Sequence, residues 1–126
     1  MMQLVNVETR STLQALHPEA LQELDNLADT IDTTGLDPAL LALCQAFFSS
    51  SLRGETWSSD RDLSDLESDC LAVCEQFMVS VSSMTDEQVA ALGRHLSADD
   101  LYNLMYAIYL IEMSERLNLM LKGTVQ

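Results

Sequence analysis

Cationic side chains are scarce in this chain of 126 residues. Lys and Arg together number 6 against 20 Asp and Glu, which gives a formal net charge of -14 at pH 7. Binding to a phosphate backbone needs cations that displace counterions, and an anionic membrane surface likewise attracts basic segments. We therefore expect neither nucleic acid nor a membrane as a partner. Because 48% of the residues are hydrophobic, the acidic residues are most simply the solvated face of a folded domain.

Features of secreted or membrane-spanning chains are also missing. The apolar run Leu101–Met113 is shorter than the roughly 18–20 residues that a bilayer crossing needs. The segment Met1–Ser11 has no basic start followed by an apolar stretch, which is the pattern of a secretory signal. Three cysteines cannot all pair within one chain, and this fits a compartment that keeps thiols reduced. We expect a cytoplasmic protein.

The sequence contains no glycine-rich phosphate loop, no cluster with metal-ligand spacing and no nucleophile triad, so we expect no cofactor. It also contains no useful run of alternating apolar and polar residues, which strands would require. The length suits one domain, residues 1–126. These absences leave an all-α domain as the expected fold class.

Local start and stop signals predict a succession of helices. Pro18 and Pro38 each mark a first helical turn, and the helix after Pro38 is expected to end before Gly54. Three further helices are expected to begin where a Ser or Thr precedes an acidic or amide residue by three positions, as in a capping box. These pairs are Ser64 with Glu67, Thr85 with Gln88, and Ser97 with Asp100.

Two segments are expected to lie outside the helices. They are the N-terminus, residues 1–11, which we expect to be irregular, and the main loop, residues 49–61, which is rich in Ser and charge. Trp57 is the one large apolar residue of this loop and is expected to anchor it to the core. Gly123 is a plausible C-terminal stop. The result is a domain of about five helices with a long, buried C-terminal helix.

The C-terminal helix carries the strongest signal for assembly. Leu101–Met113 is apolar on nearly every side, so it has to be buried by its own domain or by another copy. One stripe of this helix consists of Tyr102, Tyr106, Tyr109 and Met113, which we interpret as an oligomer contact rather than a cofactor site. We expect a homo-oligomer, and dimer, trimer and hexamer all stay open.

Several strings of the sequence resemble those of a known family. The string from Met84 to Asn118 is similar to the C-terminal half of the carboxymuconolactone decarboxylase and AhpD-like alkylhydroperoxidase families. Leu13–Leu21 and Leu36–Leu43 resemble the first two helices of these families, in the same order. The resemblance covers about Thr12 to Leu121 and implies an AhpD-like helical domain.

The redox motif of that family is missing. AhpD-like peroxidases carry a Cys-x-x-Cys pair, a His four residues after it and a Glu twelve residues before it. In this sequence Gly54 and Trp57 stand at the positions of the two cysteines, Arg61 at that of the His and Ala42 at that of the Glu. The loop 49–61 contains neither Cys nor His. Because only a thiolate attacks a peroxide, thiol peroxidase activity is not expected. The resemblance then implies a non-catalytic, oligomeric binding or interaction protein, for which a small-molecule ligand also stays open.

Two alternatives remain. The first is an enzyme with relocated chemistry, similar to a lactone decarboxylase or an isomerase, around Glu112, His95 and the tyrosines. For Glu112 the simpler interpretation is an i,i+4 pair with Arg116, and for His95 it is a structural role near a helix C-terminus.

The second alternative is a thiol or metal sensor. Cys70, Cys74 and Met78 lie four residues apart on one helix face and offer soft ligands to a thiophilic metal such as Cu(I). Free Cys and Met are also ordinary core residues, so this stripe, like Cys44, is most simply part of the core.

Overall fold

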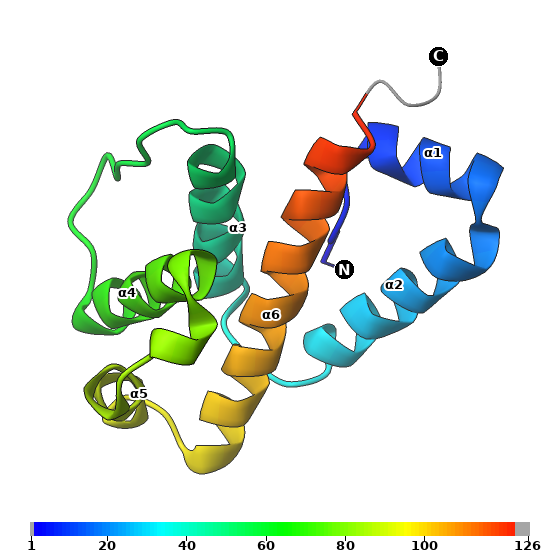
Figure 1. Ribbon diagram of the computed structural model, residues 1–126. Coiled ribbons are helices and arrows are strands. Elements are labelled where there is room, and N and C mark those ends of the chain that lie inside the picture. The colour runs from blue at the N-terminus through cyan, green and yellow to red at the C-terminus, as the bar shows by residue number, and fades with distance from the viewer. Residues whose placement is uncertain (1, 123–126) are drawn as a thin grey trace.

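The computed structural model describes residues 2–122, and these fold as an all-α protein. Six α-helices and one short 3-10 turn follow one another, and no strand is present in this part of the chain. The helices are α1 (Val7–Leu16), α2 (Pro18–Asp32), α3 (Pro38–Leu52), α4 (Asp65–Val79), α5 (Asp86–Gly93) and α6 (Ala98–Met120), and the 3-10 turn is Val81–Ser83. The long α6 passes between α1 and α2 on one side and α3, α4 and α5 on the other (Figure 1).

The core lies where α3 and α4 pack on α6. Cys44 and Phe48 of α3 are fully buried there against Leu104, Ile108 and Ile111 of α6. Burying an aliphatic or aromatic side chain of this size stabilises the fold by about 1.5–3 kcal/mol relative to leaving it in water. The N-terminal part of the chain contacts α6 from the other side, where α1 packs on it (Figure 1).

The expectation of an irregular N-terminus at residues 1–11 is wrong from Val7 onward, where α1 begins, whereas residues 2–6 lie outside the helices. Helix α1 brings the number of α-helices to six. The side chain of Asn6 caps α1 by accepting a hydrogen bond of 2.8 Å from the backbone N–H of Thr9. α1 then buries Thr9, Thr12 and Leu13. Two of these three residues are threonines, so the buried face carries no clear hydrophobic periodicity.

The segment before α1 is fixed by polar contacts with α3 and α6. The Gln45 side chain donates a hydrogen bond of 2.7 Å to the carbonyl oxygen of Gln3. The backbone N–H of Asn6 donates one of 3.1 Å to the side-chain oxygen of Asn118 on α6. Leu4 and Val5 are buried between these contacts. The chain start and the C-terminal helix are thus joined although more than a hundred residues separate them.

Most of the cap predictions are confirmed. The capping boxes of Ser64 with Glu67 and Thr85 with Gln88 are complete. At the start of α6 one of the two hydrogen bonds of a capping box is formed, since the Ser97 side chain accepts from the backbone N–H of Asp100. Pro18 is the first residue of α2, and the His17 side chain caps that helix by accepting from Ala20. Helix α3 ends before Gly54 as expected, but it includes Ser49 to Leu52, so the expected loop begins later. Gly123 lies outside the described residues.

The two faces of α6 differ in burial. One face is buried in the domain and contains Leu104, Ala107, Ile108 and Ile111. On the opposite face Tyr102 is 73% exposed and Tyr109 is 56% exposed. Within residues 2–122, no helix has both the length and the apolar character that a membrane span requires.

Candidate functional site

The outward face of α6 carries six residues that we call the outer stripe: Tyr102, Tyr106, Tyr109, Met113, Arg116 and Met120. Their separations alternate between four and three residues, so at 3.6 residues per turn they stay within a narrow band along the helix. Tyr102, Tyr109 and Met120 are exposed, and the Tyr106 and Met113 side chains are half-buried. The structure thus brings all four predicted interface residues onto one surface.

One residue of α4, Phe77, contacts the outer stripe. The rings of Phe77 and Tyr109 meet edge to face, with centroids 6.2 Å apart and planes at 79°. This arrangement is the one that aromatic pairs prefer, because the positive edge of one ring faces the negative face of the other. Phe77 fixes the position of Tyr109 without burying it. Because Phe77 lies on α4, spacing along α6 does not connect it to the tyrosines.

A shallow groove of about 320 Å³ lies at the C-terminal end of the outer stripe. It is lined by Tyr109, Glu112, Met113, Arg116, Leu117 and Met120. Arg116 donates a hydrogen bond from its Nε to the carboxylate of Glu112, which confirms the predicted i,i+4 pair. The acid in the middle of the apolar helix is therefore neutralised by a partner one turn away, and the floor of the groove is apolar.

His95 belongs to a different contact. Its Nε2 lies 2.9 Å from a carboxylate oxygen of Asp69, so it joins the end of α5 to α4. The groove beside Glu112 is not lined by His95. The enzyme alternative expected Glu112, His95 and the tyrosines to share a pocket, and this groove unites only Glu112 with one tyrosine. Asp69 was not identified from the sequence, because it is far from His95 along the chain.

The three cysteines meet in the core. Cys44 comes from α3, whereas Cys70 and Cys74 come from successive turns of α4, and all three are 0% exposed. The Cys44 and Cys70 sulfurs are 3.5 Å apart, and the Cys44 and Cys74 sulfurs are 3.7 Å apart. All three sulfur atoms lie within 4.8 Å of one another. We call this group the thiol triad.

The thiol triad differs from the expected soft-ligand stripe in one member. The sequence predicted Cys70, Cys74 and Met78, and the structure adds Cys44 to the two cysteines. Met78 is half-buried and packs against the core. The helical spacing of Cys70 and Cys74 could be recognised from the sequence, but the approach of Cys44 depends on how α3 packs on α4.

Hydrogen bonds within the thiol triad separate the acidities of its members. The contact with Cys44, followed by the one with Cys74, lowers the pKa of Cys70 to about 4, because both stabilise the thiolate. The contact with Cys70 raises the pKa of Cys44, and burial raises it further. The contacts with Cys44 and Cys70 raise the pKa of Cys74, as burial does. Cys70 is therefore the most acidic thiol of the triad.

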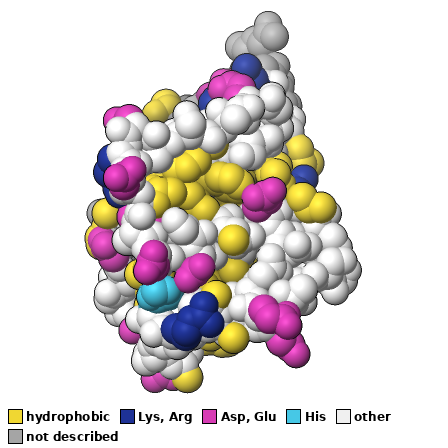
Figure 2. Space-filling view, turned by 90° about the vertical axis from the view of Figure 1, so that its left-hand side faces the viewer, with side chains coloured by type: hydrophobic (Ala, Val, Ile, Leu, Met, Phe, Trp, Pro, Cys, Tyr) yellow, Lys and Arg dark blue, Asp and Glu magenta, His cyan; other side chains and the backbone are white. Residues whose placement is uncertain are grey.

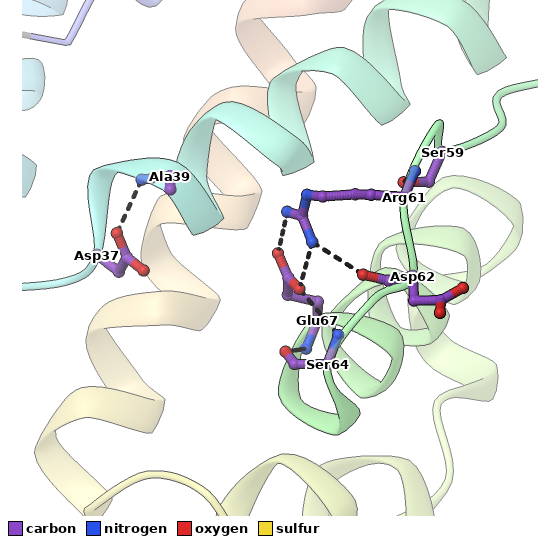
Figure 3. A network of polar contacts seen from close by, with 7 residues as sticks. All are labelled: Asp37, Ala39, Ser59, Arg61, Asp62, Ser64 and Glu67. Carbon is purple, nitrogen blue, oxygen red and sulfur yellow. Dashed lines mark hydrogen bonds and ion pairs between the residues drawn. The ribbon is translucent and has the colours of Figure 1, made fainter.

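The connection from α3 to α4 is held by an aromatic contact and an ion pair. The Trp57 and Phe47 rings meet edge to face at 6.2 Å, in keeping with the expected anchor. Arg61 donates two hydrogen bonds to Glu67, of 3.0 and 2.6 Å, and a third of 3.1 Å to the carbonyl of Asp62 (Figure 3). Arg61 thus holds the Glu67 side chain that completes the capping box of α4.

The surface crossed by this connection is mixed in character. Figure 2 shows a band of apolar side chains across the middle of that face, with carboxylates around it.

The Arg61 guanidinium holds the pKa of Glu67 at about 2, helped by the backbone N–H of Ser64. The ion pair is therefore a structural clasp for the start of α4.

Comparison with known proteins gives no assignment. No family model, no curated protein and no solved structure matches this chain.

Proposed function

We propose that this protein is a non-catalytic helical interaction module that self-associates through the outer stripe of α6. The observation that carries the proposal is the spacing of the stripe. Its six positions alternate by four and three residues, so that every second position recurs after seven residues, on the face of α6 that the domain leaves partly exposed. A repeat of 3.5 residues is the pattern by which a helix packs against another helix along its length.

The exposed aromatic residues support an interface. Tyrosine and methionine are enriched in the buried centre of protein interfaces, where a tyrosine combines a large apolar body with a polar tip. Tyr109 is already held in one orientation by Phe77, so less conformational freedom is lost when a partner covers it. The chain has 3 tyrosines in all, and each of them lies on this stripe.

The charge distribution favours a second copy of this chain as the partner. Two chains with a net charge of -14 repel each other over most of their surfaces. Between Leu101 and Ile111, however, α6 carries no charged residue, and the next acid, Glu112, is neutralised by Arg116. The stripe is thus the region where two acidic copies can approach at low electrostatic cost. A two-fold axis across α6 would pair the stripe with itself.

The AhpD-like resemblance stays a prediction and is part of this proposal. It is supported by the all-helical architecture and by the two helix starts at Pro18 and Pro38. The absence of Cys and His from residues 49–61 argues for the non-catalytic form of such a domain. Arg61 and Trp57 have structural contacts in the positions where that family carries a redox residue.

Sedimentation of the purified, reduced chain over a range of concentrations tests this proposal. The wild type is expected to form a defined oligomer at micromolar concentration. The double substitution Tyr109→Asp with Met113→Asp should give a folded monomer, because two carboxylates would then be buried in each contact. Val7→Asp is the matched control, since Val7 is exposed in the first turn of α1, where an acid is tolerated. A monomeric wild type, or an oligomer that the double variant leaves intact, would contradict the proposal.

A further inference from the structure

A second site, independent of the outer stripe, lies in the core. We propose that Cys44, Cys70 and Cys74 bind one trivalent thiophilic metalloid ion, such as arsenic(III), through three sulfur atoms. The three thiols come from two helices, and their sulfur atoms lie within 4.8 Å of one another. Thiolate sulfur is the soft ligand that thiophilic ions select. A helix pair that supplies three such ligands to one point is a preformed chelate.

The two sulfur separations from Cys44 fit a pyramidal complex. With bonds of about 2.3 Å from an ion to thiolate sulfur, a flat three-coordinate complex would hold its sulfurs about 4.0 Å apart. The two separations that involve Cys44, 3.5 Å and 3.7 Å, are shorter, as in a complex whose ion lies above the plane of the sulfurs, and the separation of Cys70 from Cys74 is within 4.8 Å. A trivalent ion with a lone pair adopts this geometry.

Charge balance selects the trivalent ion. The three thiols are 0% exposed. Their pKa values are shifted by contacts among the thiols, by burial and by a backbone hydrogen bond, and no described cation contributes. Three thiolates with Cu(I) would leave two negative charges in the core, and with Zn(II) they would leave one. An uncompensated buried charge is costly. Three thiolates with a trivalent ion form a neutral complex, which an apolar core accepts.

The binding reaction is balanced without an oxidant. Arsenious acid is a neutral molecule with three hydroxyl groups. Each thiol transfers its proton to one hydroxyl, which leaves as water, and a sulfur–arsenic bond replaces the oxygen–arsenic bond. Since the site has no exposed surface, α4 has to separate locally from α3 before the ion enters.

Native mass spectrometry of the reduced full-length chain with arsenite tests the inference. The expected product contains one arsenic per chain and has lost three waters relative to protein plus arsenious acid. A product that has lost only two waters would mean that two thiols hold the ion and would overturn the proposal. The absence of any complex would overturn it as well. Arsenite should also raise the unfolding midpoint in proportion to the logarithm of its concentration.

Alanine variants assign the ligands. Cys44→Ala, Cys70→Ala and Cys74→Ala should each weaken arsenite binding by about 100-fold, because one arm of the chelate is lost. Val73→Ala is the matched control, since Val73 is equally buried beside Cys74 on α4 but carries no sulfur. It should keep wild-type affinity although it also removes core volume. Unchanged binding in Cys44→Ala, or equal weakening in Val73→Ala, would contradict the triad. Zn(II) that displaces arsenite would contradict the charge argument.

Discussion

The two apolar faces of α6 lie on opposite sides of one helix and differ in what covers them. The inner face, with Leu104, Ile108 and Ile111, is fully buried by the rest of the domain. The outer stripe is just as regular in spacing, yet Tyr102 and Tyr109 are largely exposed. Hydrophobicity alone therefore does not show which face forms the core. The difference predicts that substitutions on the inner face reduce stability, whereas those on the outer stripe reduce association.

The largest expected effect is on the inner face. Ile108→Ala should lower the free energy of unfolding by about 2–5 kcal/mol, because it leaves a cavity in the packed core. Tyr102→Ala on the opposite face should change it by less than about 0.5 kcal/mol. Urea denaturation measured at low protein concentration gives both values. Equal losses for the two variants would break the distinction between the faces.

The next effect concerns association. Tyr109→Ala should weaken self-association by about 30-fold, which corresponds to about 2 kcal/mol for a central aromatic interface residue. Its effect on the stability of the monomer should be small, because only the edge contact with Phe77 is lost. Analytical ultracentrifugation measures the dissociation constant. A large loss of monomer stability with unchanged association would reverse the roles assigned to the two faces.

A smaller effect is expected at the helix that packs on α6 from the N-terminal side. Asn6→Ala removes the side chain that caps α1 and should lower the stability by about 1 kcal/mol. The backbone N–H of residue 6 still reaches Asn118, so α1 should fray rather than detach. Hydrogen exchange of the α1 amides measures this change. Association should be unaffected, and a change in oligomeric state would mean that the interface extends beyond the outer stripe.

The smallest effect is expected at the clasp of α4, which lies on neither face of α6. Arg61→Gln should raise the pKa of Glu67 from about 2 toward its usual value, because the guanidinium no longer stabilises the carboxylate. Since the pKa is depressed in the folded state, this contribution to stability is present above the unfolded pKa and is lost as pH falls toward 2. Carboxyl NMR titration measures it. An unchanged pKa would show that the Ser64 backbone contact dominates.

Helix starts could be predicted from the sequence because their signals are local. Ser64 with Glu67 and Thr85 with Gln88 form the expected capping boxes, and Pro18 and Pro38 open the expected helices. Helix α1 could not be predicted, because Thr9 and Thr12 occupy its buried face in place of aliphatic residues. A threonine can be buried only when the surrounding chain covers it, and a local pattern does not show this.

The two candidate sites differ in the same way. The outer stripe lies on a single helix, so its residues could be grouped from spacing alone, although their exposure could not. The thiol triad joins α3 and α4, and Cys44 is 26 residues away from Cys70 in the sequence. Helical periodicity places Cys70 near Cys74 and gives no information about contacts between helices. Sites built on one element are therefore easier to predict than sites built across two.

The tyrosines allow the most direct test of assembly through α6. Because all 3 tyrosines lie on the outer stripe, the fluorine NMR spectrum of the chain labelled with 3-fluorotyrosine reports on that surface alone. On dilution through the dissociation range, the signals of Tyr102, Tyr106 and Tyr109 should move or sharpen together. In the double variant with Tyr109→Asp and Met113→Asp, the signals of Tyr102 and Tyr106 should match those of the dilute wild type at every concentration. A wild-type spectrum that stays constant while sedimentation shows an oligomer would place the interface elsewhere and contradict the account.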